Sequence, residues 1–216
     1  MSPVVTGVLV IGGALALYFA ANPDFAFAAA GDGGSASGGS PMGETPADAP
    51  PPSGVASQFD PLIAQAASAA GIDPVLLKAI CAEESGFNTN SINPEKDFTL
   101  NGVFYTQNDR AGRNLLVAWI KDGNDPASIG LNPSCGIAQV RVGNAKKFIG
   151  ELDAWDLFDA ATCLQAAAYL IAADGTTLET ADMYNVGHGL NWLRGVRNVP
   201  YRQKVQNFAQ SFAGDF

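Results

Sequence analysis

The stretch 60-DPLIAQAASAAGIDPVLLKAICAEESG-86 decides the fold class, because it contains two consecutive helix signals. In each signal an Asp-Pro pair precedes an apolar run, and a glycine follows the run. Aspartate is a preferred N-cap, proline fits the first helical position, and glycine often ends helices. We therefore predict one helix between Asp60 and Gly71 and a second between Asp73 and Gly86.

The helical pattern continues towards the C-terminus. Apolar-periodic runs follow at about residues 114–120, 160–173, 181–184 and 202–212. Their spacing fits the helical repeat, whereas the alternation of β-branched and polar residues that indicates strands is scarce. The sequence therefore predicts one mainly α-helical domain over residues 58–216.

The N-terminal part of the chain is a different kind of polymer. Residues 4–21, VVTGVLVIGGALALYFAA, are uncharged and apolar, and a helix needs roughly 20 such residues to cross a bilayer. We predict a transmembrane anchor over residues 1–22. A cleaved secretory signal is the alternative, because Ala26-Phe27-Ala28 has the small-x-small form of a cleavage site, but no Lys or Arg precedes the apolar run.

Residues 23–57 are rich in Gly, Ser, Ala and Pro and lack apolar periodicity. Such a segment cannot bury enough apolar surface to order itself. We expect a disordered tether that holds the helical domain away from a membrane. With the anchor, it predicts a domain in the periplasm or cell-wall space, although no basic flank sets the topology.

Charge and cysteine content exclude some function classes. The formal net charge is -9 and no run of Lys or Arg is present, so nucleic acid is not an expected partner. The three cysteines lack the spacing of a zinc site. Cys81, Cys135 and Cys163 are expected either as three buried thiols or, outside the cytoplasm, with Cys135 bridged to one of the others.

Two adjacent glutamates end the second predicted helix. Leu77, Ile80, Cys81 and Glu84 lie at i, i+3, i+4 and i+7, so Glu84 continues the buried stripe. Apolar neighbours and the negative end of the helix dipole both raise a carboxyl pKa, which suits a general acid at neutral pH. Glu83 is rotated by about 100° on the helix, so the wheel favours Glu84.

Four short motifs follow one another in the predicted domain: ESGFN at 84–88, SCGIAQV at 134–140, FDAATCLQAAAYL at 158–170 and MYNVG at 183–187. Over about residues 58–212, the ordered set resembles the catalytic domain of lytic transglycosylases of the soluble-lytic-transglycosylase (SLT) type. The resemblance implies a lysozyme-like (goose-type/SLT) helical domain that acts on peptidoglycan glycan strands. Members of this family cleave the β-1,4 bond between N-acetylmuramic acid and N-acetylglucosamine and leave a 1,6-anhydromuramoyl end.

The resemblance also assigns roles to single residues. Glu84 matches the one catalytic acid and base of the family, and no metal or cofactor is implied. Substrate-binding positions carried over from the motifs are Ser85, Ser134, Gln139, Tyr184 and Asn185. Ile137 and Ala138 stand where the family usually has Leu and Met, which puts one sugar-packing contact in doubt.

The segment between the first two motifs is longer than in compact members, which predicts an insertion at about residues 90–130. It contains the arginines Arg110 and Arg113 and, among its aromatic residues, Phe104, Tyr105 and Trp119. These side chains either extend the sugar site or form a helical flap packed on the domain. We favour the flap.

Two other activities compete with this interpretation. A hydrolytic muramidase would need a second carboxylate, for which Asp97, Asp109 and Asp125 are the candidates, and a non-catalytic wall-binding assembly protein would keep the cleft without turnover. As to setting, a tethered transglycosylase would suit a phage virion that opens the wall locally during genome entry. A secretion or conjugation apparatus is the alternative assembly partner.

Overall fold

The computed structural model describes residues 58–186 and 194–216, and this part of the chain is mainly helical, as predicted. The predicted anchor and tether, over residues 1–22 and 23–57, lie outside the described residues. Within the described ranges, no helix combines the length and the apolar character needed to cross a bilayer.

The two helices of the opening stretch form where the sequence predicts them. Helix α3 spans Asp60–Ala70 and helix α4 spans Pro74–Ser85. The side chain of Asp73 caps α4 by accepting the N–H of Val75 at 2.9 Å. Asp60 is the first residue of α3, one position beyond the N-cap, so its carboxylate does not cap the helix.

Five further α-helices follow in the described chain: α5 (Arg110–Lys121), α6 (Val142–Ile149), α7 (Ala160–Asp174), α8 (Asp182–Val186) and α10 (Val199–Ser211). Three short 3-10 helices connect them: η1 (Pro126–Ile129), η2 (Ala154–Phe158) and η3 (Leu178–Thr180). The sequence predictions cover α5, α7, α8 and α10 but miss α6, which buries only Ala145. With 8 residues, α6 is shorter than the window over which a helical repeat can be recognised.

Two small antiparallel sheets accompany the helices. One has the strand order β1-β4-β5, from Ile92–Asn93, Ser134–Cys135 and Val140–Arg141, and the other is the hairpin of β2 (Phe98–Leu100) and β3 (Val103–Tyr105). The hairpin and α5 both lie within the predicted insertion, which is therefore not a purely helical flap. Strands of two or three residues are too short to show an alternating pattern.

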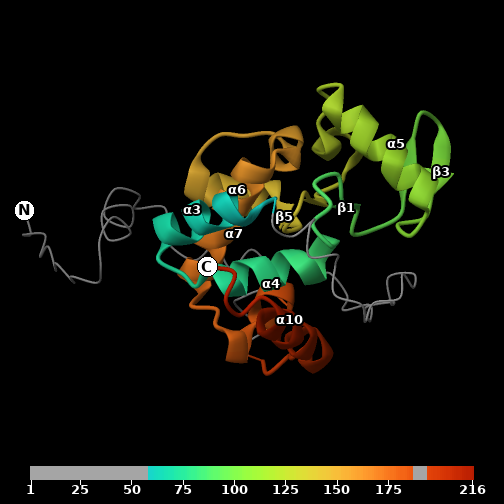
Figure 1. The fold of residues 1–216 in the computed structure, drawn as a ribbon. Coiled ribbons are helices and arrows are strands. Elements are labelled where there is room, and N and C mark those ends of the chain that lie inside the picture. The colour runs from blue at the N-terminus through green and yellow to red at the C-terminus, as the bar shows by residue number, and fades with distance from the viewer. Residues whose placement is uncertain (1–57, 187–193) are drawn as a thin grey trace, which may run out of the picture. The chain divides into compact units, whose positions relative to one another are not determined.

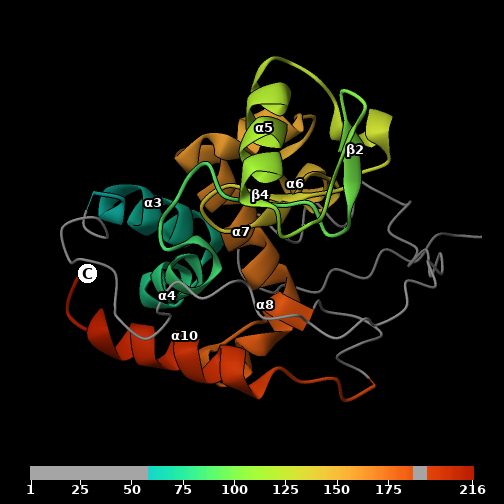
Figure 2. The same cartoon turned by 90° about the vertical axis from the view of Figure 1, so that its right-hand side faces the viewer.

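The core is built around α7, which contacts α3, α6 and, more lightly, α4. Helix α10 packs along α4, on the side of the domain away from the hairpin and α5 (Figures 1 and 2). Helix α4 thus contacts α7 and α10, which are both far from it in the sequence. Glu84 lies near the C-terminal end of α4.

Candidate active site

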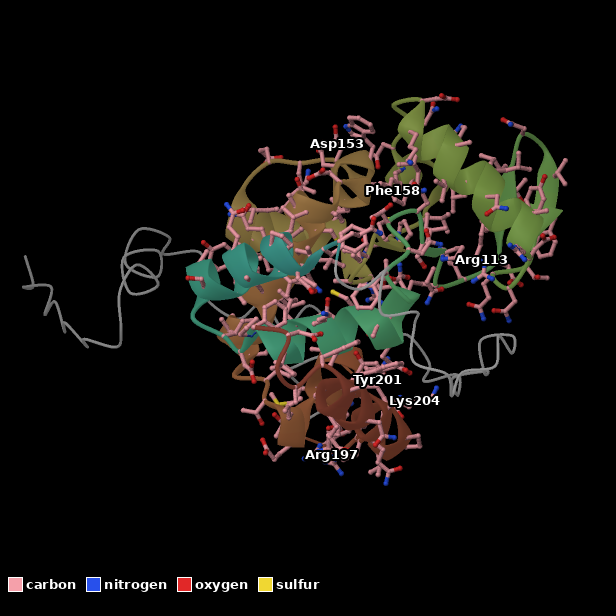
Figure 3. All side chains as sticks on the ribbon, in the orientation of Figure 1. Arg113, Asp153, Phe158, Arg197, Tyr201 and Lys204 are labelled. Atoms are coloured by element: carbon pink, nitrogen blue, oxygen red, sulfur yellow. The ribbon has the colours of Figure 1, made fainter. Side chains whose placement is uncertain are left out.

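The structure separates the two adjacent glutamates by their partners. Glu83 pairs with the Nζ atom of Lys204 at 3.4 Å, whereas Glu84 accepts a hydrogen bond from the hydroxyl of Tyr201 at 2.7 Å. Both partners come from α10, and Figure 3 labels them where α10 runs beside α4. Glu83 therefore has a cation beside it, and Glu84 has a neutral phenol.

The surroundings of Glu84 favour its protonated form. Desolvation is the largest effect and raises its pKa to about 7, with smaller upward contributions from the negative charges of Glu83 and Glu95. The hydrogen bond from Tyr201 acts in the opposite direction. Burial raises the pKa of Glu83 as well, but the charge of Lys204 opposes that shift. A carboxyl that titrates near neutrality can both give and take a proton there.

Tyr201 was not among the residues that the sequence motifs indicated. Its ring is 5% exposed, and it lies 117 positions from Glu84 in the sequence. It stands in the first turn of α10, which follows the cap residue Asn198. That helix start was readable from the sequence, because Asn198-Val199-Pro200 has the form of a helix N-terminus, but the pairing with Glu84 was not.

The motif residues Ser85 and Tyr184 join the ends of two helices to one loop. The hydroxyl of Ser85 donates to the carbonyl oxygen of Ile137 at 2.6 Å, and the hydroxyl of Tyr184 donates to that of Ala138 at 2.7 Å. Tyr184 is close enough for the charge of Glu84 to raise the pKa of its phenol, although desolvation is the larger cause. The structure thus brings the first, second and fourth motifs together around Glu84.

The second motif follows a backbone path that needs glycine at Gly136. Gly136 has φ +77°, and a Cβ there would lie 1.9 Å from the carbonyl oxygen of Leu157. Ile137 and Ala138, the departures from the family pattern, are fully buried. Their side chains pack in the core while their carbonyl oxygens accept the two hydroxyl groups described above.

Ser134 and Gln139, at the two ends of the same motif, have their polar atoms engaged within the domain. Ser134 donates to Glu95 Oε1 at 2.7 Å, and Arg141 pairs with Glu95 Oε2 at 2.7 Å. Gln139 has φ +51°, and its side-chain amide donates to the carbonyl oxygen of Gly136 at 2.9 Å. Glu95 thus holds strands β4 and β5 together at the residue pair Ser134 and Arg141.

Asn185, the second residue of the Y-N motif, is exposed at the end of α8. Its side-chain oxygen accepts a hydrogen bond from Asn198 Nδ2 at 2.8 Å. The last residue of that motif, at position 187, lies outside the described residues. Asn185 is therefore tied to the start of α10, the helix that carries Tyr201.

The carboxylates considered for a hydrolytic mechanism have local roles in the insertion. Asp97 accepts the backbone N–H of Gln107 at 2.8 Å, and Asp109 and Asp125 cap α5 and η1. None of these three contributes to the pKa of Glu84, whereas Glu95 does.

The three cysteines are free thiols buried in the core. Desolvation by burial is the main cause that raises the pKa of all three thiols. The pKa of Cys163 rises to about 11. The three thiols are therefore unreactive as nucleophiles in this form. Among residues 58–186 and 194–216, no group of three or more His, Cys, Asp or Glu side chains is arranged to hold a metal ion.

Comparison with known proteins identifies a family. The family model described as the transglycosylase SLT domain matches residues 61–203, which is more than half of the chain. This range includes all four motifs and Tyr201. No curated protein and no solved structure matches the chain.

Proposed function

Because the chain belongs to the SLT transglycosylase family, and is therefore a peptidoglycan lytic transglycosylase, we propose that Glu84 is its single catalytic acid and base. The bond cleaved in this proposal is the β-1,4 link between N-acetylmuramic acid and N-acetylglucosamine. The motif residues Ser85, Ser134, Gln139, Tyr184 and Asn185 remain proposed contributors to the saccharide cleft.

In the first half of the reaction, the protonated Glu84 donates its proton to the glycosidic oxygen as the bond from that oxygen to C1 of the muramic acid breaks. The N-acetyl group can assist at C1 while positive charge develops there. In the second half, the C6 hydroxyl of the same sugar attacks C1, and the Glu84 carboxylate takes its proton. One proton leaves Glu84 and one returns, so the cycle consumes no water and leaves a 1,6-anhydro end.

The observation that carries this proposal is the environment of Glu84. Desolvation raises its pKa to about 7, while a neutral tyrosine, Tyr201, donates a hydrogen bond to its side chain. Such a carboxyl is protonated in a large fraction of molecules at neutral pH and still ionises readily. Both states are needed when one residue serves both half-reactions.

The test is mass spectrometry of purified peptidoglycan digested by the full chain in H₂¹⁸O, beside the Glu84→Gln variant. Anhydromuropeptides without ¹⁸O, made by the parent and not by the variant, are the expected result. Glu83→Gln is the matched control, since it removes a neighbouring carboxylate that pairs with Lys204, and it is expected to keep the anhydro products. Anhydro products from Glu84→Gln at the parent rate would refute the role of Glu84.

Hydrolysis is the second candidate, and Glu95 is the specific observation in its favour. Glu95 is a second carboxylate whose charge reaches Glu84, although its two oxygens are held by Ser134 and Arg141. In the same digestion, hydrolysis would place ¹⁸O at the reducing end. If that label appears in the parent and disappears in Glu95→Gln, the chain is a muramidase with Glu95 as its second carboxylate.

The setting is also proposed: local opening of the wall during phage genome entry, by a domain tethered to a membrane on its outer side. The apolar run at 4–21 and the linker at 23–57 support it. A secretion or conjugation apparatus is the alternative. Detection of the chain in purified virus particles would support the first setting, and its recovery only with the membranes of uninfected cells would support the second.

A further inference from the structure

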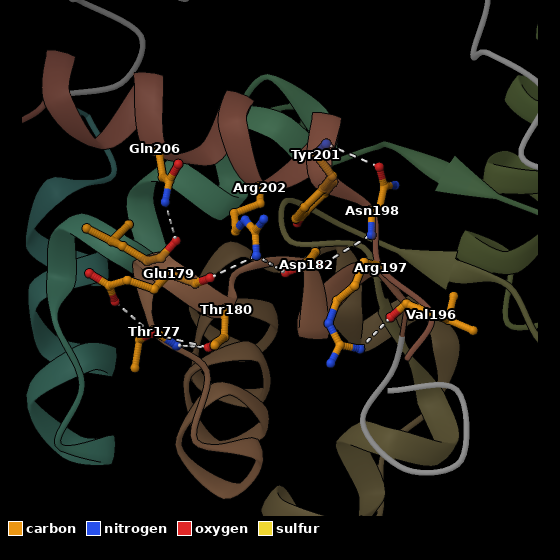
Figure 4. Close-up of polar contacts among 11 residues, drawn as sticks. Thr177, Glu179, Thr180, Asp182, Val196, Arg197, Asn198, Tyr201, Arg202 and Gln206 are labelled. Atoms are coloured by element: carbon orange, nitrogen blue, oxygen red, sulfur yellow. Dashed lines mark hydrogen bonds and ion pairs between the residues drawn. The ribbon is translucent and has the colours of Figure 1, made fainter. Parts of the chain in front are cut away.

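Asn198 makes three hydrogen bonds at the start of α10, and Figure 4 shows those to Asp182 and Tyr201. Its backbone N–H donates to Asp182 Oδ2 at 3.1 Å, and its Nδ2 donates to Asn185 Oδ1 at 2.8 Å. Its Oδ1 accepts the backbone N–H of Tyr201 at 3.2 Å. Two of these bonds fix Asn198 to α8, and the third fixes the first turn of α10 to Asn198.

The anchor on the α8 side is a buried carboxylate. Asp182 is fully buried, and its other carboxylate oxygen lies 3.7 Å from Arg202 Nη1. Arg202 in turn donates to the carbonyl oxygen of Glu179 at 3.2 Å. Burial and the ion pair restrict this carboxylate: its Oδ2 accepts the Asn198 N–H, whereas its Oδ1 has no hydrogen-bond donor among the described residues. Asn198 therefore has a fixed reference point for its side chain.

The residue that Asn198 caps is the one that holds the proposed acid. Tyr201 receives the cap of Asn198 on its backbone N–H, and its hydroxyl donates to Glu84. A continuous chain of hydrogen bonds thus runs from Asp182 and Asn185 through Asn198 and Tyr201 to Glu84. An N-cap sets the direction of the first helical turn, and this turn carries Tyr201.

We propose that Asn198 is a positioning residue for the reaction: it docks the first turn of α10 on α8 and thereby directs the Tyr201 hydroxyl at Glu84. The proposal rests on the proposed role of Glu84. Asn198 touches neither the sugar nor the acid. Its effect on kcat passes through Tyr201, whereas its bond to Asn185, a proposed cleft residue, acts on KM.

The consequence for pH dependence follows from the groups that face Glu84. These are Glu83 and Cys81 on its own helix, Glu95 beyond β1, Tyr184 on α8 and Tyr201 on α10. Among them, the Tyr201 hydrogen bond lowers the pKa of Glu84. If the loss of Asn198 misdirects Tyr201, that hydrogen bond weakens and the pKa of Glu84 rises. Activity then persists to higher pH, although with a lower maximum.

The experiment measures kcat against pH for the full chain on soluble, uncross-linked glycan strands. We expect Asn198→Ala to lower kcat about tenfold and to move the alkaline limb of the profile to higher pH. Asn198→Ser, which keeps a cap oxygen without adding a charge beside Asp182, is expected to recover most of kcat. This variant also keeps the test decisive if Asn198→Ala does not fold.

Asp159→Ala is the matched control. Asp159 is an exposed N-cap that accepts the N–H of Thr162 at 2.9 Å at the start of α7. Its removal costs stability through the same kind of interaction, without a link to Tyr201. We expect a lower melting temperature with an unchanged kcat and pH profile. A profile of Asn198→Ala that matches that of Asp159→Ala would reduce Asn198 to a structural cap and overturn the proposal.

A double-mutant cycle tests the route of the effect. If Asn198 acts through Tyr201, then Asn198→Ala adds no further loss of kcat in a Tyr201→Phe background. Independent, multiplying losses would overturn the proposal. Glu84→Gln distinguishes a failure of the proposed function from a failure of the inference about Asn198. An active Glu84→Gln variant refutes the proposed function and with it this inference. An inactive Glu84→Gln with multiplying losses refutes this inference alone.

Discussion

Helix α4 carries Lys78 near its start and Glu84 near its end, and the structure treats these two charges in opposite ways. Lys78 is 1% exposed, but its Nζ lies 2.6 Å from a carboxylate oxygen of Asp60 and 2.6 Å from one of Asp215. It also lies over the ring of Phe212, 4.8 Å from its centroid. Its charge is thus neutralised where it is buried.

Glu84 is half-buried and loses hydration without such compensation. Its hydrogen-bond donor is a neutral phenol, and the charged groups that shift its pKa, Glu83 and Glu95, are both acidic. A paired buried charge holds segments together and stays ionised, while an unpaired one changes its protonation state instead. One helix thus carries a structural ion pair near its start and the proposed proton donor near its end.

The largest expected effect is a loss of activity when Glu84 is replaced. Replacing Glu84 with Gln removes the proton donor but keeps the shape, so we expect the rate of anhydromuropeptide release to fall on the order of 1,000-fold. The variant should be at least as stable as the parent at pH 8, because a neutral amide replaces a poorly solvated carboxylate. Release rates and melting temperatures check both statements; a large loss of stability would contradict this view of the site.

When Lys78 is replaced, we expect the effect to be on stability. Lys78→Met leaves the carboxylates of Asp60 and Asp215 facing an apolar group and each other. Because both are partly exposed and can be hydrated again, we expect a loss of about 3 kcal/mol in the free energy of unfolding. Urea titration measures it. The specific activity of the folded variant at low temperature should match that of the parent, and a selective loss of turnover would show that the two ends are not independent.

The pH dependence of stability sharpens the contrast. The pKa of Glu84 is about 7 in the folded chain, above its ordinary value of 4.5, so the folded state binds the proton more tightly than the unfolded state. The contribution of Glu84 is therefore fully present below about pH 4.5 and is lost as pH rises to about 7, by on the order of 3 kcal/mol. The difference between parent and Glu84→Gln unfolding curves across this range isolates the effect; a constant difference would contradict the raised pKa.

A smaller effect is expected from the phenol. Tyr201→Phe removes the hydrogen bond that lowers the pKa of Glu84, so the alkaline limb of the activity profile should move to higher pH. Loss of an orienting bond to the acid should lower kcat about tenfold. Initial rates between pH 5 and 9 on the full chain measure both. A movement of the alkaline limb to lower pH would mean that Tyr201 stabilises the protonated acid instead.

Local signals of the sequence predicted the helical frame well. The Asp-Pro pairs and glycines around α3 and α4 specify their ends, because capping depends on residues a few positions apart. The buried stripe of Leu77, Ile80 and Cys81 was confirmed, and so was the family indicated by the ordered motifs. The same wheel favoured Glu84 over Glu83, and the structure gives these two residues different partners.

Contacts between side chains far apart in the chain could not be predicted from the sequence. Lys78 stands within an apolar run, but its burial depends on Asp60 and on Asp215, which lies 137 positions away. Tyr201 reaches Glu84 across 117 positions, and no periodicity or spacing rule connects such residues. Short strands such as β1 and β4 depend on each other for their hydrogen bonds, so neither shows a pattern alone. These features come from tertiary packing.

The most direct test of the account is the titration of the Glu84 carboxyl carbon by ¹³C NMR in the full chain, assigned by comparison with Glu84→Gln and Glu83→Gln. The account predicts a midpoint near pH 7, with the adjacent Glu83 titrating separately. A midpoint near 4.5, the ordinary value for a glutamate, would show that Glu84 is ionised at neutral pH. It would contradict the claim that uncompensated burial makes this residue the proton donor.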